Sequence, residues 1–496
     1  MSATNDPSPS QSQLNSLLEH YQSGRYEDAE KLAISITQQF PNHSFSWKVL
    51  GATLKKTGRI SESLVASQKA VEIAPQDAEA HSNLGNTLQA LGRLEEAEAS
   101  HREAISLEHD RAETHSNLGI TLFKLGRLED AEVSFRETIA LKPDFFEAHS
   151  NLGNTLQELG RLEEAEASHK QALALNPENA EVYRNLGVTL KELGRLEDAE
   201  SSYRHAITLK PDFVEAHNNL GITLQGLGRL EESEASFRQV IALKPDYAEA
   251  WNNLGNTLQS LGRLEEAEVN YINTIKLKPD YADVFWNLSS LAKTIVDAEH
   301  WLDKCLTADA SHVKAKLTKT ALRFYQGDRT DFDDLMQSKF KDHSYMRSFS
   351  WVFLLPNLPE LYFNKWSFYD AIAKKSIRSR PFYEFGVWRG VAFKYLIKTF
   401  KKGYGFDTFT GLPEDWDVEK GLEKGTYSSD GNVPNIKGGE FIIGKFEDTL
   451  PIFYSESRPL ASVINFDADL YSSTICALNF SKSVMDKHTI LIFDEL

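Results

Sequence analysis

A fixed period of 34 residues runs through the first three hundred residues of the chain. The pair Gly-Arg marks each unit, with its glycine at Gly24, Gly58, Gly92, Gly126, Gly160, Gly194, Gly228 and Gly262. The pair Asn-Leu recurs in step from Asn83 to Asn287, and a proline closes most units. A period of this length is typical of stacked repeats, in which each unit buries its apolar face against its neighbours.

Each unit carries the signals of two helices joined by a turn. Apolar residues of one unit fall at roughly helical spacing, at Leu84, Leu88, Leu91 and Leu94. Gly92 lies where the turn needs a residue that tolerates positive φ. The closing proline cannot continue a helix, so the unit ends there. The sequence therefore predicts an all-α solenoid.

The pattern resembles the tetratricopeptide repeat, whose consensus is matched in one unit by Trp251, Leu254, Gly255, Leu258, Ala267, Tyr271 and Pro279. The resemblance covers residues 14–312, as eight full repeats and a degenerate ninth with Val296 at the glycine position. We expect residues 313–364 to form capping and linker helices, because terminal repeats are atypical. Residues 1–13 are polar and are predicted to be disordered.

The repeats are similar to those of O-GlcNAc transferase, a family in which a ladder of asparagines holds the backbone of an extended peptide. An amide side chain offers one donor and one acceptor to each peptide unit. The resemblance implies a peptide-binding role for Asn83, Asn117, Asn151, Asn185, Asn219 and Asn253. The alternative is that asparagine is simply a polar residue at a solvated repeat position.

The period is lost after Gly327, and short apolar runs then alternate with helical stretches. This alternation predicts a doubly wound α/β domain over residues 365–496. The expected strands are Phe382–Phe385, Tyr404–Asp407, Phe441–Ile443, Val463–Asp467 and Ile490–Asp494.

The first predicted strand leads into a turn with two glycines, in the segment EFGVWRG. Glu384, Gly386 and Gly390 lie in this segment, and Asp407 ends the next strand about twenty residues later. In nucleotide-binding α/β folds, glycines at this turn let the ligand approach the backbone, and an acid on the next strand binds ribose hydroxyls. The tighter Gly-x-Gly-x-x-Gly pattern is absent from the sequence, which disfavours NAD.

Five ordered blocks of this domain, EFGVWRG, GFDTFTGLPEDW, GKFEDTLP, FDADLYSST and IFDE, resemble the macrocin O-methyltransferase family. That family methylates sugar hydroxyls in antibiotic biosynthesis. The resemblance implies a class I methyltransferase fold, with S-adenosylmethionine held by Glu384, Gly386, Gly390 and Asp407. It also implies a divalent metal, usually magnesium, and a sugar or glycan acceptor.

Acidic residues at the predicted strand ends fit the implied magnesium site, because magnesium prefers oxygen ligands. The candidate ligands are Asp467, Asp494 and Glu495. The metal would lower the pKa of a bound hydroxyl, and Asp467 would accept its proton. Alternatively, these acids cap following helices or are solvated.

The family continues beyond the fifth strand, so the sequence predicts a sheet that lacks its last strands. Three interpretations follow: a sugar O-methyltransferase with a recruiting repeat domain, a binding scaffold with an inactive α/β domain, and a methyltransferase acting on a peptide in the solenoid. An interaction role for the repeats is common to all three.

The net charge of −18 argues against a general nucleic-acid binder, which would need clustered basic residues. The N-terminus lacks the basic and apolar regions of a secretory signal, and no apolar run has membrane-spanning length. We therefore expect a cytoplasmic protein that binds neither membrane nor nucleic acid. The only two cysteines, Cys305 and Cys476, do not form a disulfide framework or metal motif.

Overall fold

The computed structural model describes residues 8–355, 357–411, 429, 431–468 and 471–493. Its contacts divide the chain into two compact units, Met1–Phe213 and Val214–Leu496. The division falls inside the repeats, so the last repeats belong to the same unit as the α/β domain. Across the described residues, no helix combines the length and apolar character needed to cross a bilayer.

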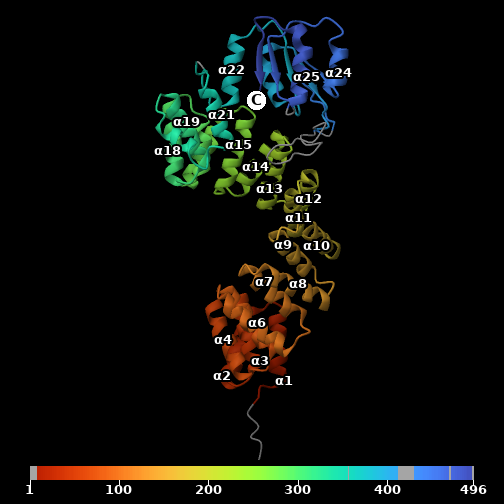
Figure 1. Cartoon of the computed structure of the whole chain (residues 1–496). Helices are drawn as coiled ribbons and strands as arrows, with labels where there is room; N and C mark the ends of the chain where they lie inside the picture. Colours follow the sequence, from red (N-terminus) through yellow and green to blue (C-terminus); the bar gives the residue numbers. More distant parts are fainter. Residues whose placement is uncertain (1–7, 356, 412–428, 430, 469–470, 494–496) are drawn as a thin grey trace, which may run out of the picture. The chain divides into compact units, whose positions relative to one another are not determined.

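The first unit is a series of antiparallel helix pairs, coloured red to gold in Figure 1. Its helices are α1 (Gln11–Gln22), α2 (Tyr26–Gln39), α3 (Ser44–Lys56), α4 (Ile60–Ile73), α5 (Ala78–Ala90), α6 (Leu94–Leu107), α7 (Ala112–Lys124), α8 (Leu128–Leu141), α9 (Phe146–Glu158), α10 (Leu162–Leu175), α11 (Ala180–Glu192) and α12 (Leu196–Leu209). Helix α1 begins at Gln11, so its first three residues lie in the segment 1–13 that was predicted to be disordered. The reason is a capping box, in which Ser10 and Gln13 satisfy each other's backbone N–H groups.

The two helices of a repeat are held close together by a glycine on the first helix and a larger side chain on the second. A Cβ atom at Gly119 would lie 2.7 Å from the ring of Phe135, and one at Gly187 would lie 2.6 Å from Tyr203. Both rings are essentially inaccessible to solvent. Any residue larger than glycine would therefore separate the helices and open the core.

Consecutive repeats are also joined by the arginine of the Gly-Arg turn. Arg127 donates to Glu98 of the preceding repeat at 2.8 Å and to Asp130 of its own repeat at 2.5 Å. Arg161 bridges Glu132 and Glu164 in the same way. Because solvent screens such exposed pairs, they link consecutive repeats but add little to the stability of the stack.

The second unit begins with α13 (Val214–Gly226), α14 (Leu230–Leu243), α15 (Ala248–Ser260) and α16 (Leu264–Leu277), which are the seventh and eighth repeats. The ninth is α17 (Ala282–Ser289) with α18 (Ile295–Ala308), and its first helix is short. Three more helices follow, α19 (Val313–Tyr325), α20 (Thr330–Met336) and α21 (Ser344–Phe353). Cys305 is buried in α18, and both it and Cys476 are free thiols.

The α/β domain contains a parallel sheet of five strands in the order β3-β2-β1-β4-β5. The strands are β1 (Phe382–Phe385), β2 (Gly403–Asp407), β3 (Gly439–Ile443), β4 (Val463–Phe466) and β5 (Ile490–Phe493). All five strands overlap the segments predicted from the sequence. The order reverses between β1 and β4, which creates the switch point where doubly wound sheets bind ligands.

Helices cover both faces of this sheet (Figure 1). One face packs on α22 (Lys365–Lys375) and α23 (Val391–Phe400), through a core that includes Trp366, Phe382 and Phe393. The other face packs on α24 (Phe446–Phe453) and α25 (Tyr471–Ser481), which is followed by the short 3-10 helix η1 (Lys482–Val484). The central strands β1, β2 and β4 are thus buried on both sides, as is usual in parallel sheets.

Two repeats of the first unit bury a histidine where others bury an aromatic ring, and this makes the unit sensitive to acid. His101 and His169 are 0% exposed, and their ring nitrogens have no hydrogen-bond partner among the described residues. Burial, with nearby Lys55 for His101 and Arg184 for His169, lowers the pKa of each to about 4. Each neutral ring therefore stabilises the fold fully above pH 6.5, and this contribution is lost as pH falls toward 4.

We predict that lowering the pH from 7 to 4.5 reduces the free energy of unfolding by about 2–3 kcal/mol for each histidine. The double change His101→Phe and His169→Phe, which copies Phe135, should remove much of this loss. Native-state hydrogen exchange of α6 and α10 measures it. His205→Phe, at an exposed histidine, is the control and should leave the acid sensitivity intact. An unchanged pH dependence in the double variant would contradict the assignment.

Candidate functional site

The candidate site lies at the carboxyl edge of the sheet, where the ends of β1 and β4 meet. The N–H of Asp467 donates to the carbonyl of Phe385 at 2.8 Å, and the N–H of Gly386 donates to the carbonyl of Phe406 at 2.9 Å. Gly386 has φ of 88°, and a Cβ there would overlap the carbonyl oxygen of Asp467. Only glycine allows the chain to leave β1 so close to β4.

Asp407 fixes the turn that follows β1. One carboxylate oxygen accepts the N–H of Trp388 at 2.7 Å, and the other accepts the N–H of Phe409 at 2.7 Å. Trp388 and Phe409 both have positive φ, so these bonds hold two unfavourable backbone conformations. Burial raises the pKa of the Asp407 carboxyl, and the N–H groups oppose that rise. Asp407 thus stabilises the turn in addition to lining the pocket.

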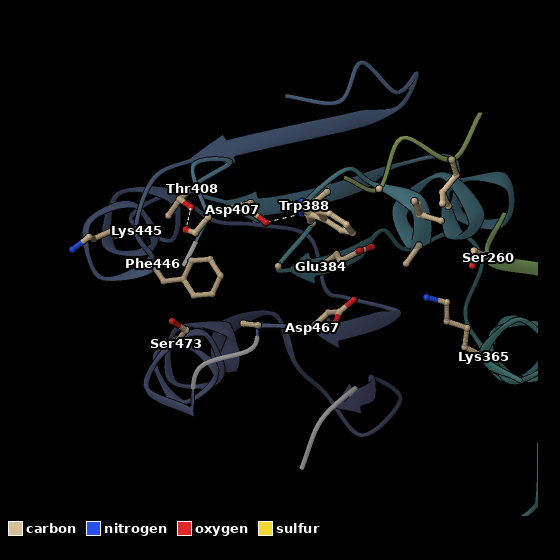
Figure 2. A pocket seen from close by; sticks show the side chains of 18 of the residues that line it. Ser260, Lys365, Glu384, Trp388, Asp407, Thr408, Lys445, Phe446, Asp467 and Ser473 are labelled. Carbon is tan, nitrogen blue, oxygen red and sulfur yellow. Dashed lines mark hydrogen bonds between the residues drawn. The ribbon is translucent and has the colours of Figure 1, made fainter. Parts of the chain in front are cut away.

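A cavity of about 420 Å³ opens at this edge, a volume typical of small-ligand sites. Glu384, Gly386, Asp407 and Asp467 line it from the sheet. Figure 2 shows the carboxylates of Glu384 and Asp467 on the same part of the pocket, with Thr408, Phe446 and Ser473 at one end. Four predicted residues that lie up to 83 positions apart in sequence therefore share one cavity.

Glu384 is an acid placed inside a strand, where it is only 1% exposed. Its register partner on β4 is Asn465, which is 0% exposed. The side-chain amide of Asn465 makes no hydrogen bond to any described residue. Buried polar groups normally have hydrogen-bond partners. A buried carboxyl and a buried amide side by side in the sheet, next to the pocket, are therefore not explained by apolar packing alone.

The remaining predicted cofactor and metal residues are placed as follows. Gly390 has φ of 72° and is the N-cap of α23, whose first residues Val391 and Ala392 line the cavity. Asp494 and Glu495 lie outside the described residues. Among those that are described, no group of three or more His, Cys, Asp or Glu side chains could hold a metal ion. The predicted magnesium ligands are therefore represented only by Asp467.

Among the lining residues that were not predicted from the sequence, five lie before the first strand. Gln225, Gly228 and Leu230 come from the seventh repeat, Ser260 comes from the eighth, and Lys365 begins α22. Gly228 and Leu230 belong to the same Gly-Arg-Leu motif that other repeats carry, so the motif gave no sign of a second role. Lys365 lies before the first strand, where no motif marked it.

The six predicted peptide-binding asparagines all lie in the first helix of their repeats. The backbone carbonyl of each accepts the hydroxyl of a threonine four residues later. Asn185 is buried, while the others are partly exposed. The amide of Asn253 donates to Asn218 at 3.4 Å, whereas the side chains of Asn83, Asn117 and Asn151 make no hydrogen bond within the described part of the chain.

We predict that Gly386→Ala destabilises the α/β domain by about 3 kcal/mol, because it combines positive φ with a backbone overlap. Gly431→Ala is the control. Gly431 has φ of 74° but faces open space, so it should cost only about 1 kcal/mol. Thermal unfolding of the full chain measures both, and equal costs would contradict the close approach of β1 and β4.

Comparison with known proteins supports the repeat assignment. One family model of the tetratricopeptide repeat matches residues 76–144 and 144–212, and a second matches residues 248–281. A third model, described as TPR repeat, matches residues 226–262. No curated protein matches the chain. The methyltransferase likeness of residues 365–496 rests on its sequence blocks alone.

Solved structures with a similar fold include YrrB, described as a TPR protein with an unusual peptide-binding site (24% identity, 38% of this chain and 96% of that chain, TM-score 0.34). Another is PilF of Pseudomonas aeruginosa (20% identity, 41% of this chain and 92% of that chain, TM-score 0.38). A third is the Cut9–Hcn1 complex of the APC/C (18% identity, 60% of this chain and 58% of that chain, TM-score 0.41). Residues 76–212 and 226–281 of this chain are tetratricopeptide repeats.

Proposed function

We propose that this chain is a protein- or peptide-binding scaffold whose α/β domain binds a small ligand at the switch point of its sheet. The tetratricopeptide repeats support the first part, because solenoids of this type expose an extended surface that binds proteins. The cavity between Gly386, Asp407 and Asp467 supports the second part. The repeat assignment is the observation on which this proposal chiefly depends.

The asparagine positions suggest how a peptide is held. In the first unit, Asn83, Asn117 and Asn151 lie at equivalent positions of consecutive repeats, and their amides are not used for internal hydrogen bonds to described residues. An extended peptide could thus pair with several amides in turn. Its sequence would be read weakly, since backbone groups are common to all peptides.

To test this, we would select tight-binding peptides from a random library with the full chain, and then titrate them against the variant Asn83→Ala, Asn117→Ala, Asn151→Ala. The account predicts a loss of affinity of at least tenfold, since two or three hydrogen bonds of about 1 kcal/mol each are removed. The matched control changes Glu95, Glu129 and Glu163 to glutamine on the exposed start of the second helices. Unchanged affinity in the alanine variant would exclude the ladder.

The second candidate function is an S-adenosylmethionine-dependent O-methyltransferase, favoured by the sheet order and by the glycine turn at the switch point. S-adenosylmethionine supplies an electrophilic methyl group when it is bound. Gly386 leaves room for it to approach the backbone, and Asp407 holds the turn in shape. Asp467, which directly follows β4, would accept the proton of an acceptor hydroxyl.

The acceptor and the metal follow from the family resemblance. A sugar hydroxyl follows only from the family resemblance, and a peptide hydroxyl held by the repeats fits the scaffold equally well. Magnesium would need Asp467 together with Asp494 and Glu495, because the described residues do not by themselves supply a complete carboxylate set.

Calorimetry with S-adenosylmethionine separates the two candidates. The methyltransferase proposal predicts saturable binding by the full chain. Asp407→Ala should weaken it at least tenfold, because the Trp388 and Phe409 N–H groups lose their acceptor. Asp467→Ala should lose methyl transfer, whereas Asp448→Ala, at an exposed acid of α24, should behave as the wild type. If the wild type does not bind S-adenosylmethionine, the methyltransferase proposal is excluded and the scaffold proposal is the one that stands.

A further inference from the structure

The turns of the seventh and eighth repeats differ from those of the first unit in what covers them. The turn glycines from Gly24 to Gly194 have no other atom within 4 Å of a Cβ position. At Gly228, however, a Cβ would lie 2.5 Å from the indole of Trp388, and at Gly262 it would lie 3.1 Å from that of Trp366. Both tryptophans belong to the α/β domain, so two repeat turns are built into its surface.

Polar contacts hold the same junction. The indole N–H of Trp366 donates to the carbonyl of Gln259 at 2.6 Å, and the amide of Asn364 donates to the carbonyl of Ser290 at 3.1 Å. Lys394 of α23 also pairs with Glu231 of α14 at 3.2 Å. The repeats are thus a fixed wall beside the sheet edge, and they place Gln225, Leu230 and Ser260 in the cavity.

The charges of the cavity are unevenly distributed. Glu384 and Asp467 lie along its middle, whereas Ser260 and Lys365 lie at the repeat end (Figure 2). The ammonium group of Lys365 points into the pocket in this view. It forms no salt bridge with a described residue, and its contact is the face of Trp366 at 5.1 Å. The other lysine of the lining, Lys445, lies at the opposite end, 4.0 Å from the carboxylate of Glu447. A lysine and a hydroxyl at the repeat end, beside the acids in the middle, favour a ligand with charges of both signs.

We propose that the seventh and eighth repeats complete the ligand site, and that Lys365 and Ser260 bind a carboxylate of a zwitterionic, amino-acid-like ligand. The positive part of the ligand then faces Glu384 and Asp467. A dianion such as phosphate fits less well, because the acids of the pocket would repel its second charge. This inference rests on the proposed cofactor pocket, since S-adenosylmethionine has such an amino-acid end.

The test compares S-adenosylmethionine with its decarboxylated form, by calorimetry on the full chain. Decarboxylation removes the negative charge and should therefore improve binding to an acidic pocket that has no carboxylate site. The proposal predicts the opposite: the wild type binds S-adenosylmethionine at least tenfold more tightly. Lys365→Met should abolish most of this preference, and Lys374→Met, on an exposed lysine of the same helix, should preserve it.

The contribution of the repeats is tested from their own side. Ser260→Trp should fill the end of the cavity that the repeats line, and should weaken the binding of S-adenosylmethionine at least tenfold. Ala90→Trp, at the equivalent position of the third repeat, is the matched control and should have no effect. If the wild type binds both compounds equally, or if Ser260→Trp binds normally, this inference is overturned while the cofactor proposal stands. Binding of neither compound would overturn both.

Discussion

The packing of two tryptophans onto two repeat turns determines how the second unit is built. Trp388 covers Gly228, and Trp366 covers Gly262, at positions where a side chain on the glycine would meet the indole ring. Both glycines also have positive φ, so the turn geometry and the contact require the same residue. Because Trp388 belongs to the turn held by Asp407, this contact links the repeat stack directly to the candidate ligand site.

The regular parts of the structure could be predicted from the sequence because they follow from local patterns. The 34-residue period located the helix pairs, and the alternating apolar runs located all five strands. The positions of Gly386 and Asp407 indicated the edge of the sheet at which the cavity opens, since strand ends of a parallel sheet meet there. The start of α1 was misjudged because the capping pair Ser10 and Gln13 was not recognised in a polar segment.

The junction could not be predicted because it depends on contacts between residues far apart in sequence. Gly228 and Trp388 are separated by 160 positions, and Gly228 lies in a motif that recurs in every full repeat. The sequence therefore gave the same interpretation to turns that face solvent and to turns that face the α/β domain. Ser260 shows the same limit, since the residues at its position in other repeats do not line this cavity.

Scaffold and ligand pocket are not independent in this account, since the repeats that end the solenoid also form a wall of the cavity. The most direct measurement is hydrogen exchange of the full chain with and without saturating S-adenosylmethionine. Slower exchange is predicted at the turn after Gly386 and also at the repeat turns around Gly228 and Ser260. Slower exchange in the α/β domain with unchanged repeat turns would contradict a shared site.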